Sequence, residues 1–144
     1  MAITQALPNS FKKQLLDGDQ DFSSAGCDKF KLALYVSTAT LGASTTSYTA
    51  SGEVSSSGTG YTTGGLALVN SGTSVVSTVA FTDFADLSFT SVTLTARGCL
   101  IYNTSFSNSA VAVLNFGADK TATAGTFTIQ FPAFTSSAAI IRIS

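Results

Sequence analysis

Apolar and polar residues alternate along most of this chain with the period of two that is typical of half-buried β-strands. Residues 30–36 show the pattern well, since every second side chain is large and apolar: Phe30, Leu32, Leu34 and Val36. Six further segments have strand character: residues 66–69, 75–81, 92–102, 111–116, 126–131 and 139–143. The pattern predicts seven strands, and Tyr48 marks a candidate eighth.

The stretches between these segments are rich in Gly, Asn and Ser, as turns and loops are. The longest of them, residues 37–65, reads as a loop region or bulged edge. An interruption at Arg97-Gly98-Cys99 predicts a β-bulge within the strand at 92–102. No helical period appears after Asp17. This spacing of strands predicts an all-β fold, a single-domain antiparallel β-sandwich of the jelly-roll or immunoglobulin-like type.

The N-terminal segment differs from the rest of the chain. A two-turn helix is predicted after Pro8, with Asn9 or Ser10 as the N-cap and Gly18 at its end. Its apolar side chains share one face: Phe11, Leu15 and Leu16. A helix this short is unstable alone in water, so it must dock either on its own domain or on a neighbouring subunit. We therefore divide the chain into an N-terminal arm with a short helix, residues 1–28, and a β-sandwich domain, residues 29–144.

Composition makes the predicted surface polar but almost uncharged. Charged residues are 10% of the 144, against roughly 25% in ordinary proteins, whereas Ser and Thr number 21 each. The formal net charge is −1, and a net charge near zero favours association because copies repel each other weakly. Two interpretations fit equally well: a protein packed beside neighbours in an assembly, and a stable secreted β-domain.

Several partners are disfavoured by the same composition. The seven Lys and Arg residues are scattered, so no basic face for nucleic acid is expected. No apolar run reaches the roughly 20 residues that span a membrane, and residues 1–14 contain no apolar signal-peptide core. Cys27 and Cys99 form no metal-binding motif and are interpreted as two small buried thiols, with a disulfide left open.

No set of residues indicates catalysis, a metal site or a cofactor site. Histidine is absent, so the many hydroxyl groups lack the usual base. Asp83 and Asp86 form the best carboxylate pair, but they lie on a predicted turn, where hydrogen bonding to the backbone explains them better than glycosidase chemistry. We expect a protein that is not an enzyme. Tyr48 and Tyr61 are candidate partner contacts, because Tyr is enriched in interfaces.

Two long segments carry a resemblance to a known family. The first contains Lys31-Leu32-Ala33-Leu34-Tyr35 and ends at Gly58-Thr59-Gly60-Tyr61-Thr62-Thr63-Gly64-Gly65. The second contains Gly98-Cys99-Leu100-Ile101-Tyr102-Asn103 and continues to Ile140-Ile141-Arg142-Ile143. In these patterns of turns and strands the chain resembles a family of small structural proteins from the virions of tailed bacteriophages.

The resemblance implies a place in the virion and synthesis in the host cytoplasm, which fits the missing signal peptide. Size and the lack of fibre-like repeats favour a cement or decoration protein on the capsid exterior. Such a protein would bind the major capsid protein and itself, as a homotrimer. The candidate contact residues are Phe11, Leu15, Leu16, Tyr48 and Tyr61. The alternatives are a tail, adaptor or fibre-associated virion protein and, more remotely, a carbohydrate-binding β-sandwich.

Overall fold

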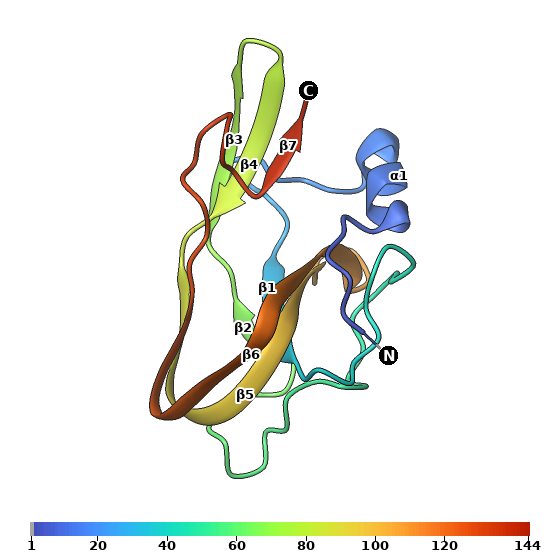
Figure 1. Ribbon diagram of the computed structural model, residues 1–144. Coiled ribbons are helices and arrows are strands. Elements are labelled where there is room, and N and C mark those ends of the chain that lie inside the picture. The colour runs from blue at the N-terminus through green and yellow to red at the C-terminus, as the bar shows by residue number, and fades with distance from the viewer. Residues whose placement is uncertain (1) are drawn as a thin grey trace.

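Seven strands form two antiparallel sheets in the computed structural model, which describes residues 2–144 (Figure 1). In spatial order, the larger sheet contains β2 (Leu66–Ala67), β1 (Phe30–Tyr35), β5 (Leu87–Asn103) and β6 (Ser109–Ile129). The smaller sheet contains β3 (Asn70–Val76), β4 (Val79–Phe84) and β7 (Ile141–Ile143). The predicted all-β sandwich with a short N-terminal helix is confirmed.

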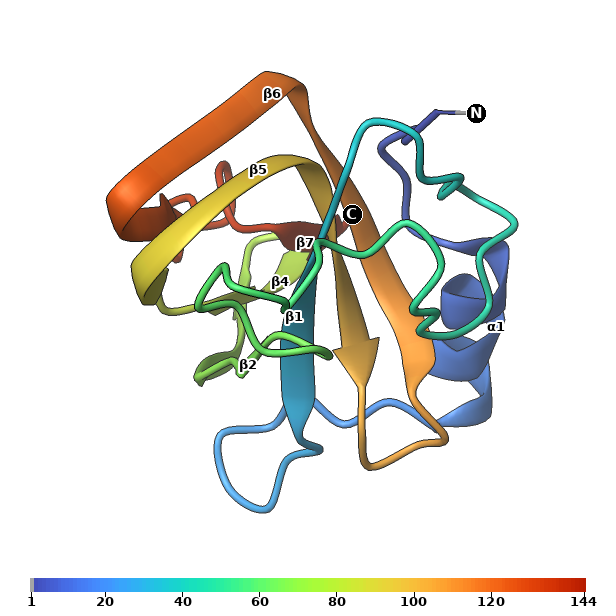
Figure 2. The same ribbon diagram turned by 90° about the horizontal axis from the view of Figure 1, so that it is seen from below.

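The two longest strands, β5 and β6, form one antiparallel hairpin. Both strands bend strongly, so the hairpin curls around the interior of the molecule (Figures 1 and 2). Shifts of register accompany the bend, and the one between Ala96 and Gly98 confirms the predicted bulge. Ser91 and Ala124 have positive φ angles of 54° and 45°, which turn the chain more sharply than a regular strand does.

Residues 111–116 and 126–131, predicted as two strands, both belong to β6. The residues between them, among them Gly117 and Lys120, are exposed and resemble a turn in the sequence. The strand nevertheless continues through a bulge: residues 116–119 have no partner in β5, and pairing resumes with Lys120 opposite Ala96. The prediction of two strands is wrong because exposure, and not a turn, interrupts the apolar pattern.

Residues 75–81, predicted as one strand, are divided between β3 and β4. The chain reverses at Ser77, whose φ angle is 55°, and Val75 pairs with Ala80 across the resulting hairpin. Alternation misleads here because this end of the hairpin is exposed on both faces. At the candidate eighth strand near Tyr48, the described residues form only an isolated bridge, between Ser47 and Ser109.

The core has two parts, one on each face of the larger sheet. The main part lies between the two sheets and contains a group of packed rings: Phe11, Phe22, Phe30 and Phe84. Phe22 stacks on Phe30 with ring centroids 4.6 Å apart. The smaller part, on the other face, includes Ile3, Leu41 and Leu100. Because both faces of its central strands are covered, β1 is almost entirely buried.

The helix α1 (Asn9–Asp17) and the residues before it dock on their own chain. Phe11 is fully buried in the main core, while Ala6 and Val113 exchange two backbone hydrogen bonds at the edge of β6. Gly18 ends the helix in the left-handed conformation, as predicted. The predicted N-cap is wrong: Pro8 occupies that position, and no side chain caps the helix. Docking of Phe11 therefore holds the helix in place without a side-chain cap.

Candidate functional site

The four tyrosines of the chain lie close to its single glutamate, and we call this group the tyrosine cluster: Tyr35, Tyr48, Tyr61, Tyr102 and Glu53. Tyr61 donates a hydrogen bond of 2.7 Å to Glu53 Oε1, and Tyr48 donates one of 2.6 Å to Oε2. The backbone N–H of Gly64 donates a third, of 2.7 Å, to Oε1. Both carboxylate oxygens are therefore engaged within the chain.

The remaining contacts of the cluster fasten the long loop region to the larger sheet. The N–H of Leu34 in β1 donates to the Tyr61 hydroxyl at 2.9 Å. The Tyr102 hydroxyl donates to the carbonyl of Gly64 at 2.6 Å, and its ring stacks on Tyr48. Burial raises the pKa of Tyr61, so its hydroxyl stays protonated at neutral pH. The cluster is a structural clamp, with no ionised phenol to act as a base.

The structure separates the five predicted contact residues. Phe11 and Tyr61 are buried by their own chain, with exposed fractions of 0% and 3%, and their contact with a partner stays a prediction. Leu16 is 90% exposed on the outer face of α1. Leu15 is half-buried and lines a groove beside the smaller sheet. Tyr48 is half-buried in the tyrosine cluster.

Asp83 and Asp86 each bind the nearby backbone. Asp83 lies in β4 and not on the expected turn, and its Oδ1 accepts the N–H of Phe84 at 2.9 Å. Burial raises the pKa of the Asp83 carboxyl, against the lowering effect of the N–H groups of Phe84 and Ile140. Asp86 Oδ1 accepts the N–H of Phe131 at 2.7 Å. These contacts fit the local hydrogen bonding expected from the sequence.

The two cysteines are unpaired. Cys99 is fully buried, and burial raises the pKa of its thiol. Cys27 is only half-buried, so its predicted burial is wrong. Among residues 2–144, no group of three or more Cys, Asp or Glu side chains lies close enough together to hold a metal ion. The single helix of that range is too short to cross a membrane.

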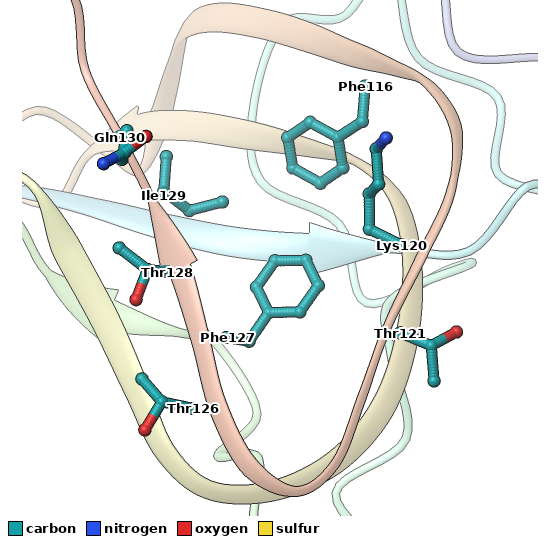
Figure 3. A pocket seen from close by; sticks show the side chains of 8 residues that line it. All are labelled: Phe116, Lys120, Thr121, Thr126, Phe127, Thr128, Ile129 and Gln130. Atoms are coloured by element: carbon teal, nitrogen blue, oxygen red, sulfur yellow. The ribbon is translucent and has the colours of Figure 1, made fainter.

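A shallow pocket of about 480 Å³ lies along the bend of β6 (Figure 3). The rings of Phe116 and Phe127 face it with centroids 6.1 Å apart, and Lys120 lies near its rim. The other lining residues are mainly threonines, and Thr121 and Thr128 already pair with hydroxyl groups of β5. The pocket offers an apolar floor but no pair of groups that could exchange protons with a substrate.

The outer end of the smaller sheet exposes apolar side chains that the alternation of residues 75–81 did not indicate. Three large apolar side chains are more than half exposed there, those of Val75, Val76 and Ile143. The signal in the sequence that could have found it is the lack of any charged residue from Ser71 to Thr82.

No family model, curated protein or solved structure matches this chain.

Proposed function

We propose that this protein is a phage capsid cement protein, bound to the exterior of the assembled shell, where it bridges adjacent copies of the major capsid protein. The resemblance described above suggests the virion. The weakly charged surface, rich in Ser and Thr, suits a protein that is packed beside neighbours.

The observation that carries the proposal is the exposed apolar end of the smaller sheet. Val75 is 64% exposed, Val76 53% and Ile143 55%. Val75 and Ile143 share one face of the sheet, and exposed apolar side chains that cluster usually mark an interaction surface. The Glu53 carboxylate is engaged by tyrosine hydroxyls within the chain, while large apolar side chains point outward, which fits a binding role better than a catalytic one.

Cementing needs no chemistry beyond selective binding. A ligand that binds only the assembled shell stabilises it by RT ln(1 + [L]/Kd), about 2.7 kcal/mol per site at a free concentration of 100 Kd. An oligomer that contacts several capsid subunits at once gains further through effective concentration. Many modest contacts can therefore hold a shell together.

The number of copies per virion tests the proposal. Quantitative mass spectrometry of purified particles should find the protein in the hundreds, because a cement protein repeats over the whole shell. A dozen copies or fewer would contradict it and would favour the alternative of a tail, adaptor or fibre-associated protein.

Binding to assembled and unassembled capsid protein provides a second test. The purified chain should cosediment with empty shells and should not bind the free major capsid subunit, since the sites exist only between neighbouring subunits. Equal binding to both forms would contradict the cementing mechanism.

A further inference from the structure

One face of the smaller sheet carries an apolar row, which we define as Val75, Ala80 and Ile143. Val75 lies opposite Ala80 in the β3–β4 pair, and Ala80 lies opposite Ile143 in the β4–β7 pair. Residues directly opposite one another point to the same side of an antiparallel sheet. The three side chains therefore form one row across three strands, and each of them is exposed.

A groove between the sheet and α1 adjoins Val75, and Ala80 and Ile143 of the row form part of its wall. Its walls include Leu15 of α1, Phe22 and Ile141, and its volume is about 130 Å³. The Thr82 hydroxyl donates to the carbonyl of Gly72 at 2.7 Å, so this polar atom is satisfied and the groove is apolar throughout. Apolar cavities of similar volume hold a benzene-sized group, so a branched aliphatic side chain would fit.

Charge restricts what can bind there. None of the groove-lining residues is charged, and residues 71–82 contain no charged side chain. The nearest cation on this sheet, Arg142, lies opposite Phe81 and therefore points to the other face. A charged partner would lose hydration without gaining an ion pair. The surface that fits is itself uncharged, apolar and β-branched, and the apolar row has that chemistry.

We propose that this face binds a second copy of the same chain, with Val75 of one copy inserted into the groove of the next. A protruding row and a groove on one face are complementary, so a single surface supplies both halves of the contact. Two copies related by a two-fold axis, or three in a ring, satisfy it equally. The inference deepens the proposed function, because it names the contact through which a cement oligomer forms.

A contact of ordinary size would need only a small part of the exposed surface of each copy. A standard interface takes about 800 Å² from each partner, roughly a ninth of the 7094 Å² exposed by this chain. The outer part of the β3–β4 hairpin is exposed on both faces, and β7 lies beside it (Figure 1). The net charge of −1 leaves little repulsion between copies.

The test is the mass of the purified full-length chain in sedimentation equilibrium, for wild type and three variants. Val75→Glu and Ile143→Glu place a charge in the apolar row. Val69→Glu is the matched control, because Val69 is 69% exposed but lies outside the row. Wild type should have a multiple of the 14.7 kDa chain mass. Val75→Glu should raise the dissociation constant at least about 100-fold, since burying an unpaired charge is strongly unfavourable, and Val69→Glu should change it less than about threefold.

Thermal unfolding followed by circular dichroism shows whether each variant is folded. If Val75→Glu unfolds, Ile143→Glu decides the matter, because it lies in the short last strand and leaves the hairpin intact. A monomeric wild type at tens of micromolar, or a folded Val75→Glu that remains oligomeric, would overturn the inference.

Measurements on shells separate this inference from the proposed function. A monomeric wild type that binds shells through Val75 would overturn the inference and place the major capsid protein on this face, while cementing would stand. An oligomer that depends on Val75 but occurs in only a few copies per virion would support the inference and contradict cementing.

Discussion

At the scale of single residues, the hydroxyl group of Tyr61 makes two hydrogen bonds in a position largely closed to water. It accepts the N–H of Leu34 and donates to Glu53. A buried donor that loses its acceptor bears the full loss of hydration. The N–H of Leu34 therefore depends on this hydroxyl as its acceptor. The half-buried Tyr48 hydroxyl, in contrast, donates a hydrogen bond to Glu53.

Replacing Tyr61 with Phe should lower the free energy of unfolding by about 1–3 kcal/mol, because the N–H of Leu34 is left buried without a partner. Tyr48→Phe is the control and should lose less, because its half-buried hydroxyl donates to Glu53 but leaves no buried N–H without an acceptor. Urea unfolding of both variants measures the difference. Equal losses would show that the Leu34 contact does not matter.

A second prediction at the scale of single residues concerns Asp83 and the dependence of stability on pH. Its pKa is raised above the ordinary value of 3.8, mainly by burial. Below pH 3.8 the carboxyl is protonated in the folded and unfolded states alike, and its contribution to stability is complete. As the pH rises towards the folded-state pKa, the unfolded state ionises first, so stability falls.

The free energy of unfolding of wild type, taken relative to Asp83→Asn, should therefore decrease as the pH rises from 3.5. The slope should not exceed about 1.4 kcal/mol per pH unit, the limit for one proton. Urea titrations at a series of pH values give this difference, in which the other carboxylates cancel. A difference that increases with pH would contradict the assignment.

At the scale of elements, Gly65 determines how closely the loop region approaches β1. Its φ angle is 77°, and a Cβ atom there would lie 1.7 Å from the carbonyl oxygen of Leu32. Gly58 has a similar φ of 71° but open space around it. The same substitution at the two positions separates the effect of a left-handed backbone from that of a clash between the added methyl group and β1.

Gly65→Ala should destabilise the fold by roughly 3 kcal/mol or more, because the β1–β2 pairing must shift to admit the methyl group. Gly58→Ala should lose only about 1 kcal/mol, the ordinary penalty for a left-handed residue with a side chain. Thermal or urea unfolding distinguishes them. Similar losses would mean that the loop region moves freely away from β1.

The alternation of apolar and polar residues predicts strands correctly where it reflects burial of the apolar side chains, and it misleads where it does not. The strand at Phe30 was predicted closely because its alternating large apolar residues, Phe30, Leu32 and Leu34, do pack into the main core. The hairpin at Ser77 was missed because Val75, Val79 and Phe81 all fall on alternate positions, although Val75 is exposed and faces no core. The tyrosine cluster could not be predicted either, because it joins Glu53 to residues as distant as Tyr102. Such contacts depend on how the chain folds back, which local patterns do not encode.

At the scale of the whole molecule, the two thiols report on different opening events. Cys99 has no exposed surface in the core of the larger sheet, whereas Cys27 lies partly exposed in the segment that links α1 to β1. Local fluctuations suffice to expose Cys27, but exposing Cys99 requires the sheet itself to open.

A thiol reagent should therefore modify one cysteine per native chain rapidly and the second only at the rate of global unfolding. In denaturant both should react at once. Mass spectrometry of the modified protein identifies the residue, and Cys27→Ser should abolish the rapid phase. Rapid modification of Cys99 in native buffer would contradict the packing described for β5.

The continuous β5–β6 hairpin also has a consequence for how quickly the molecule can fold. Its pairing begins at Asn103 and Ser109, which are near neighbours in sequence, and ends at Leu87 and Ile129. The hairpin can therefore close progressively from its turn, with a small loss of loop entropy at each step. Pairing of β1 with β5, which joins Phe30 to Asn103, must instead bring distant parts of the chain together. That step should set the overall rate, in the range of milliseconds to seconds typical of β-proteins with many long-range contacts.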